Sequence, residues 1–289
     1  MHPRLFHSLV LLDPVIQSEP SQGPPTPDNR WVALNTILST HRRDIWPSRQ
    51  AAAESFARSP FYKAWDPRVL ERWIKYALRE LPTAIHPLPP SSGSPACQPG
   101  DKPVTLLTTK HQEVFTFSRP NYEYDPTTNQ PADRSTHPDL YPDGFNPQPF
   151  YRPEWGLVFA QLPHLRPSVL YVFAGQSDMG GPPELRDAKL RTTGTGVGGS
   201  GGVAAGRVRS VFFDDKGHLL AQEAVDECAD AAARFFGAEL PRWRTEEAKF
   251  QERWSRKSKI EKVTVDERWM KEVGPPLARG EKVEQTSKL

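Results

Sequence analysis

Three stretches along the chain are mostly apolar. They lie in His7–Ile16, where the apolar run ends before Asp13, in Pro167–Gly175 and in Val208–Phe213. A strand that is covered on both faces, as in a parallel sheet, is expected to read as an unbroken apolar run rather than as an alternating one. The pattern therefore predicts a parallel sheet and an α/β fold.

Between the first two runs the apolar positions follow a helical period. They predict helices over Trp31–Thr40, from Pro47 through Phe56, and over 108–118. The clearest helix begins at Asp66, which is a natural N-cap before Pro67, and carries an apolar stripe up to Leu78. A further amphipathic helix is predicted to follow the third strand.

Proline-rich stretches suggest how the chain is organised. The chain has 289 residues and 31 prolines, roughly twice the usual share. We interpret residues 1–16 as a strand of a core sheet and 17–160 as a helical cap insertion with long loops. Residues 161–240 form the rest of the core, and 241–289 form a charged helix and a flexible tail. Long loops in compact domains are often lids over active sites.

Composition and charge limit the classes of function. The net charge of +2 gives no reason to expect nucleic-acid binding. Cys97 and Cys228 are far apart, so neither a disulfide framework nor a zinc site is indicated, and we expect no metal or organic cofactor. No apolar run reaches the roughly 18 residues of a membrane span, so none is expected.

Two polar side chains are predicted to meet at one edge of the sheet. Asp13 follows the first apolar run, and His218 lies in a tight loop between the third strand and a helix. Ligands and chemistry collect at the carboxyl ends of strands in open α/β sheets. From the local sequence alone, however, an aspartate before Pro14 is about as often a simple turn former.

Several sequence blocks in order resemble a fungal peroxisomal α/β-hydrolase family. The blocks are HPRLFHSLVLLDPVI at 2–16, WPSR at 46–49, DPR at 66–68, GGSGG at 198–202, GRVR at 206–209 and GHL at 217–219. That family includes acyl-CoA hydrolases of mycophenolic acid biosynthesis, a peroxisomal lipase and hydrolases of host-selective toxin biosynthesis. The resemblance covers nearly the whole chain. It implies the C-terminal portion of an α/β-hydrolase fold, with Asp13 and His218 as catalytic acid and base.

The catalytic serine is the part of this pattern that the chain does not show. In the α/β-hydrolase fold the serine lies on a strand-to-helix turn before the acid in chain order, so we expect the chain to begin after it. Ser200 matches Gly-x-Ser-x-Gly but lies in a glycine loop that leads into a strand. Ser177 follows a strand, but Pro182 and Pro183 are expected to obstruct the immediate start of the helix that an elbow needs.

A second aspartate competes with Asp13 for the role of the acid. Many α/β-hydrolases carry the acid after the strand that corresponds to Ser168–Ala174, and Asp178 lies there. Either carboxylate could orient the imidazole. The resemblance favours Asp13.

The last three residues, Ser287-Lys288-Leu289, match a peroxisomal address that an import receptor reads at a free terminus. Together with this address, the family resemblance implies a peroxisomal hydrolase of an acyl-CoA thioester in fungal secondary metabolite or toxin biosynthesis. One alternative is a peroxisomal ester lipase. Another is a catalytically inactive remnant that acts as a binding protein.

Overall fold

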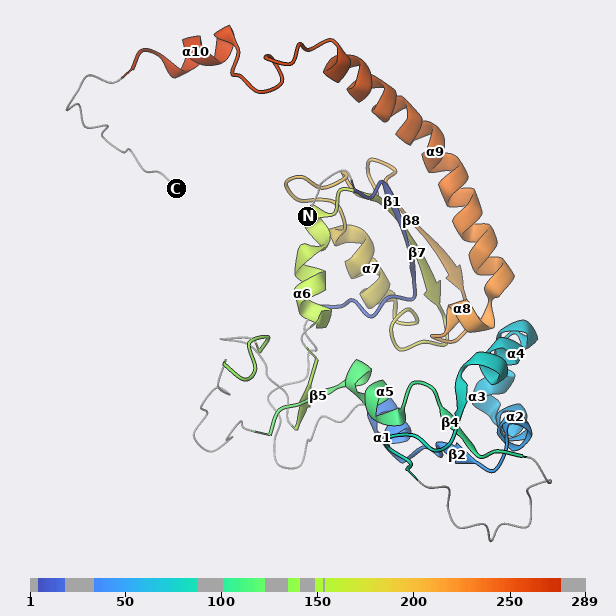
Figure 1. Cartoon of the computed structure of the whole chain (residues 1–289). Helices are drawn as coiled ribbons and strands as arrows, with labels where there is room; N and C mark the ends of the chain where they lie inside the picture. Colours follow the sequence, from blue (N-terminus) through green and yellow to red (C-terminus); the bar gives the residue numbers. More distant parts are fainter. Residues whose placement is uncertain are drawn as a thin grey trace. The chain divides into compact units, whose positions relative to one another are not determined.

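The structure is a computed structural model that describes residues 5–18, 34–87, 101–122, 135–140, 149–152 and 154–276 (Figure 1). Two compact units divide the chain, Met1–Phe236 and Gly237–Leu289. Parts of the predicted cap loops, the start of the first predicted helix, Cys97 and the terminal tripeptide lie outside the described residues. In the described part, no helix is long and apolar enough to cross a membrane.

A parallel sheet forms the core, in the strand order β1-β7-β8 (Figure 1). The strands are β1 (Ser8–Leu12), β7 (Ser168–Ala174) and β8 (Val208–Phe213). Ser8 pairs with Ser168, and Val169 pairs with Val208. All three strands lie where the apolar runs predicted them, and the fold class is α/β as predicted.

The three strands differ in how completely they are covered. All seven residues of β7 are buried, whereas the five residues of β1 are only half-buried. The prediction of complete coverage on both faces is therefore right for β7 and wrong for β1 and for β8, of which only Val208 is buried. Among the described residues β1 has a sheet neighbour on one side only, which explains the difference.

Helices cover both faces of β7. Leu170 and Val172 pack with residues of α8 (Leu220–Glu223) and of the start of α9 (Val225–Ser255). Tyr171 and Phe173 pack on the other face with Leu190 of α7 (Pro183–Thr192). Burying each such large side chain contributes about 1.5–3 kcal/mol, so β7 is the main anchor of the core.

Residues 34–117 contain most of the short elements of the predicted cap. These are α1 (Leu34–His41), β2 (Ile45–Trp46), α2 (Arg49–Arg58), α3 (Pro60–Lys63), α4 (Pro67–Tyr76), β3 (Leu78–Glu80), β4 (Val104–Leu106) and α5 (Lys110–Phe117). The N-caps are Ser48 for α2, Asp66 for α4 and Thr109 for α5. The strands form an antiparallel sheet in the order β2-β4-β3, which the sequence did not predict.

An aromatic cluster joins this sheet to its helices. It contains Trp46, Phe56, Tyr62 and Trp65, with Trp73 packed against it. The rings meet mostly edge to face, as in Trp46 with Phe56 at 5.2 Å between centroids. Such aromatic pairs add about 0.5–1.5 kcal/mol beyond their burial.

The remaining described elements are short, except for α9. They are β5 (Arg119–Pro120), β6 (Phe150–Tyr151), α6 (Glu154–Gln161), the 3-10 helix Leu162–His164 and α10 (Glu267–Val273). Helix α9 runs unbroken through Pro241. The charged helix expected after residue 240 is thus a continuation of the helix that follows His218.

Candidate active site

Asp13 lies at the carboxyl end of β1 and is almost completely buried, with 1% of its surface exposed. Its N–H donates to the Val172 carbonyl at 2.7 Å, so the pairing with β7 continues through Asp13. The Ala174 N–H donates back to Asp13 Oδ1 at 3.2 Å. Sheet pairing therefore fixes both the backbone and the carboxylate of this residue.

The backbone of Asp13 adopts a positive φ of 41°. A non-glycine residue in a sparsely populated region costs on the order of 1–3 kcal/mol and persists only where its surroundings impose it. Here the surroundings are the two β7 hydrogen bonds before the turn and Pro14 after it. This backbone conformation turns the chain sharply after β1 and keeps the carboxylate at the end of the sheet.

His218 lies in the loop that follows β8. The Gly217 N–H donates to Glu223 Oε2 at 2.7 Å, and the Gln176 N–H donates to the Lys216 carbonyl at 2.9 Å. The loop is thus tied to α8 on one side and to the end of β7 on the other. Both ties lie within two residues of His218 and restrict where its ring can go.

The structure brings Asp13 and His218 together. The distance between Asp13 Oδ2 and His218 Nδ1 is 2.7 Å, with the carboxylate fully buried and 45% of the imidazole side chain exposed. When Nδ1–H donates to the carboxylate, Nε2 is the ring's acceptor. This is the arrangement of a histidine prepared to take a proton from a hydroxyl group.

Asp178 does not share this contact. Its side chain is exposed, and no hydrogen bond joins it to His218 among the described residues. Of the two candidate acids, Asp13 is the one that the fold places on the imidazole.

Ser177 and Ser200 each lie in a turn. Ser177 is buried, and its Oγ accepts from the Met179 N–H at 3.0 Å. Ser200 Oγ accepts from the Gly202 N–H at 3.4 Å, in the glycine loop before β8. No hydrogen bond joins His218 to a serine within the described part of the chain.

No helix starts immediately after Ser177, as the two prolines led us to expect. A turn separates Ser177 from α7, with the Gly181 N–H donating to the Ser177 carbonyl at 2.7 Å. Helix α7 then starts at Pro183, where proline is favoured because the first helical position needs no N–H partner. Ser177 is therefore not on a sharp strand-to-helix elbow.

Three further residues surround the acid and were not identified from the sequence. Gly180 packs against Asp13, and Arg186 and Lys189 of α7 hold the turn that contains Gly180. Lys189 is 1% exposed. The proline start of α7 was the sequence signal that could have revealed this helix and its basic side chains.

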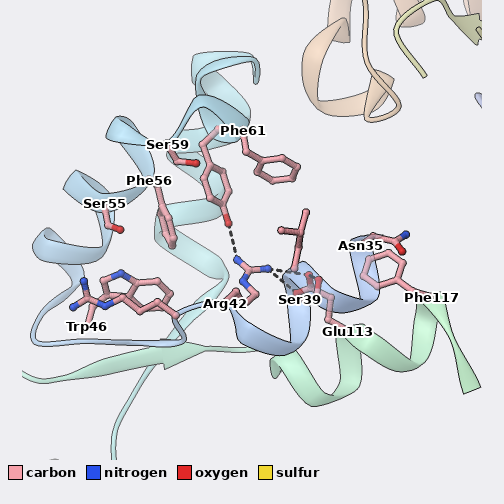
Figure 2. A pocket seen from close by; sticks show the side chains of 13 residues that line it. Asn35, Ser39, Arg42, Trp46, Ser55, Phe56, Ser59, Phe61, Glu113 and Phe117 are labelled. Atoms are coloured by element: carbon pink, nitrogen blue, oxygen red, sulfur yellow. Dashed lines mark hydrogen bonds and ion pairs between the residues drawn. The ribbon is translucent and has the colours of Figure 1, made fainter. Parts of the chain in front are cut away.

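A pocket of about 450 Å³ lies among α1, β2, α2, α3 and α5 (Figure 2). Its apolar lining includes Leu38, Trp46, Phe56, Phe61, Tyr62 and Phe117. Figure 2 shows Arg42 reaching into the middle of this lining, with Glu113 beside it. The volume and the mostly apolar walls with a few polar groups are typical of small-molecule sites.

The polar groups of the pocket are bonded to one another. Arg42 Nη1 donates to both carboxylate oxygens of Glu113, at 2.9 and 2.7 Å, and Nη2 donates to the Tyr62 hydroxyl at 2.9 Å. Burial raises the pKa of the Tyr62 phenol, and the adjacent Arg42 guanidinium opposes that rise. Tyr62 is therefore neutral and can both donate and accept.

Comparisons with known proteins identify relatives of the chain, although no family model matches it. It is 35% identical to the type I acyl-CoA thioesterase mpaH of Penicillium roqueforti over 97% of this chain and 64% of that protein. It is 27% identical to the abhydrolase domain-containing protein AKT2 of Alternaria alternata over 93% of this chain and 88% of that protein. A solved structure, the peroxisomal α/β-hydrolase Lpx1 of Saccharomyces cerevisiae, superposes with a TM-score of 0.47 and 14% identity, over 83% of this chain and 49% of that one.

The extent of these matches differs between the relatives. The chain spans 64% of the length of the Penicillium thioesterases and 88% of the length of the Alternaria protein. The resemblance seen in the sequence is supported by these relatives: the chain is similar over most of its length to fungal type I acyl-CoA thioesterases and to the Alternaria abhydrolase-domain proteins.

Proposed function

We propose that the chain provides the acid and the base of a serine-hydrolase triad that cleaves an acyl-CoA thioester. The observation that carries this proposal is the 2.7 Å hydrogen bond between Asp13 Oδ2 and His218 Nδ1. The two residues follow each other in the chain order acid then histidine, which is the order of the α/β-hydrolase fold.

In this proposal His218 Nε2 removes the proton from a serine hydroxyl as the serine attacks the thioester carbonyl. His218 then returns the proton to the CoA sulfur as the carbon–sulfur bond breaks, and water releases the acyl group in a second, similar step. Asp13 keeps Nδ1 protonated and stabilises the imidazolium. The nucleophile is a serine outside the described residues.

Two observations support an acyl-CoA as the substrate. The Penicillium relatives are named as type I acyl-CoA thioesterases. The pocket of the cap offers an apolar, aromatic lining for an acyl group, and the aromatic cluster that lines it also packs against Leu219, the residue next to His218. The cluster that forms part of the pocket wall thus also packs against the loop that carries His218.

The cellular setting in this proposal is the peroxisome of a fungus, in the biosynthesis of a secondary metabolite or toxin. It is supported by the Ser287-Lys288-Leu289 motif, which fits a peroxisomal import receptor, and by the fungal relatives.

The decisive experiment measures thiol release from acyl-CoA by the protein expressed from its own gene in a fungal host. We expect hydrolysis by the wild type and its loss in His218→Ala, because no other group replaces the base. His164→Ala is the matched control, since His164 is also exposed and its Nδ1 contacts the Val197 carbonyl. Equal activity in the His218→Ala and wild-type proteins, or an inactive wild type, would overturn the proposal.

A further inference from the structure

Helix α7 holds one turn of the chain with two basic side chains. Arg186 Nη1 donates to the Gly180 carbonyl at 2.9 Å and also to the Gly181 carbonyl. Lys189 Nζ donates to the Met179 carbonyl at 3.0 Å. Residues three apart share one face of a helix, so three successive carbonyls are held by a single face of α7.

This turn lies directly against the catalytic acid. A Cβ atom on Gly180 would lie 2.0 Å from Asp13 Oδ1 and 2.8 Å from the Ala174 nitrogen. Only glycine permits so close an approach. The turn therefore packs on the carboxylate oxygen that does not face His218, beside the N–H that donates to it.

Lys189 also places a charge in the same buried region. Lys189 is 1% exposed, and the side chain of Asp13 is fully buried. Burying either ion alone would cost several kcal/mol. Burial lowers the pKa of Lys189 to about 8, and the Asp13 carboxylate opposes this shift. The two charges thus interact, although no direct ion pair joins these two described side chains.

We propose that Arg186 and Lys189 are positioning residues for the Asp13–His218 pair. They fix the turn 179–181 against Asp13 Oδ1, which leaves Oδ2 for the imidazole, and the Lys189 ammonium balances the buried negative charge. The catalytic meaning of this inference rests on the proposed function. Its effect on the Asp13–His218 hydrogen bond can be measured without any turnover.

The test observes that hydrogen bond by proton NMR. An imidazole N–H bonded to a carboxylate gives a resonance far downfield, and His218→Ala assigns it. We expect this resonance to be lost or moved upfield in Lys189→Met and in Arg186→Met. Arg191→Met is the matched control, since it removes an equal charge from an exposed position of the same helix.

Kinetics on the protein expressed from its own gene provide the second measurement. We expect kcat for acyl-CoA hydrolysis to fall on the order of 10²-fold in Lys189→Met, as misplacement of a catalytic group does, with KM little changed. Unfolding curves should show that the variant remains folded. If it does not, Arg186→Met gives the same comparison.

The outcomes separate the two proposals. A resonance lost in Lys189→Met and retained in Arg191→Met supports the positioning role, even if the wild type proves inactive and the proposed function fails. A wild-type resonance in both Lys189→Met and Arg186→Met overturns the positioning role, whatever the activity.

Discussion

At position 13 the chain accepts a backbone conformation that most residues avoid, and it buries a carboxylate there. The positive φ, the two hydrogen bonds to β7 and the contact with His218 all concern this one residue. Strained residues of this kind cluster at functional sites. A residue that only forms a turn before a proline needs neither a buried carboxylate nor a histidine partner. Asp13 has both, which favours a functional role for it.

The first prediction separates the two candidate acids. We expect Asp13→Asn to lower kcat by on the order of 10⁴-fold, because an amide lets the imidazole adopt the wrong tautomer. We expect Asp178→Asn to have little effect, since Asp178 is exposed and makes no hydrogen bond to His218. Acyl-CoA hydrolysis by both variants checks this; a crippled Asp178→Asn protein with an active Asp13→Asn protein would reverse the assignment.

The second prediction concerns the glycine beside the acid. A methyl group on Gly180 would meet Asp13 Oδ1 at 2.0 Å, so Gly180→Ala should lower the free energy of unfolding by about 1–3 kcal/mol, as overpacking does. Gly237→Ala is the control, because nothing lies within 4 Å of its added Cβ. It should raise stability by about 0.5–1 kcal/mol, because alanine favours the helix. Urea unfolding of both proteins measures the difference, and equal midpoints would refute the close approach.

Among the elements, α7 contacts both the core sheet and the turn that packs against Asp13. It covers one face of β7 through Leu190 and holds the turn 179–181 through Arg186 and Lys189. Because Lys189 of α7 is buried while it holds this turn, its ammonium group is taken out of water. The free-energy cost of burying that charge depends on pH.

The third prediction gives this pH dependence. The pKa of Lys189 is about 8 in the folded chain against 10.5 in the unfolded one. Between these values the unfolded state binds more protons, so this group makes stability rise with pH, by on the order of 3 kcal/mol for a shift of this size. Below pH 8 the penalty for burying the charge is fully present.

Urea unfolding at several pH values up to 10.5 tests this, with the wild type compared with Lys189→Met. The neighbouring charged or titratable side chains, Asp13 on β1, His218 after β8 and Arg186 on α7, are the same in both proteins. The stability difference between wild type and variant should therefore increase in favour of the wild type as pH rises. A difference that stays constant with pH would contradict the buried charge.

Much of the fold at this scale could be predicted from local patterns. The apolar runs located all three core strands, and caps such as Ser48 and Asp66 located helices. The sheet β2-β4-β3 was missed because strands of two or three residues have no recognisable period. Helix α7 was missed because its start looks like a proline-rich turn and its interior is mostly charged.

The candidate site was likewise predicted only in part. Asp13 and His218 could be predicted because both follow strands of one parallel sheet, whose carboxyl ends meet at one edge. Gly180 and Lys189 could not, since their importance arises from how closely a turn approaches a carboxylate. That approach is a tertiary property with no local signal in the sequence.

Taken as a whole, the described molecule combines a parallel core, a module of residues 34–117 with its own aromatic cluster, and a charged C-terminal unit. This module contacts the helices that follow His218: the Asp66 N–H donates to the Gln222 carbonyl at 2.7 Å, and Arg68 pairs with Asp226 at 3.0 Å. The start of α4 thus contacts α8 and α9, the helices that follow the loop carrying His218.

The fourth prediction concerns the terminal residues, which lie outside the described structure. A fluorescent protein that carries residues 277–289 at its C-terminus should collect in peroxisomes, because the import receptor reads Ser-Lys-Leu at a free end. Removal of Leu289 from the fusion should leave it diffuse. Fluorescence microscopy in a fungal cell checks both, and a diffuse signal from the intact fusion would contradict the address.

The complete burial of β7 also has a consequence for how the chain folds. Its seven residues, SVLYVFA, carry no charge, and such segments aggregate when they are exposed. β8 follows β7 after a single helical crossover, whereas the Ala174–Asp13 contact spans 161 positions and the His218–Asp13 contact spans 205. Contacts between distant segments form slowly, so we expect β7 to pair with β8 first and the acid to join its histidine late. During that interval the edge of β7 that pairs with β1 is open, and we expect chaperones to bind this aggregation-prone segment.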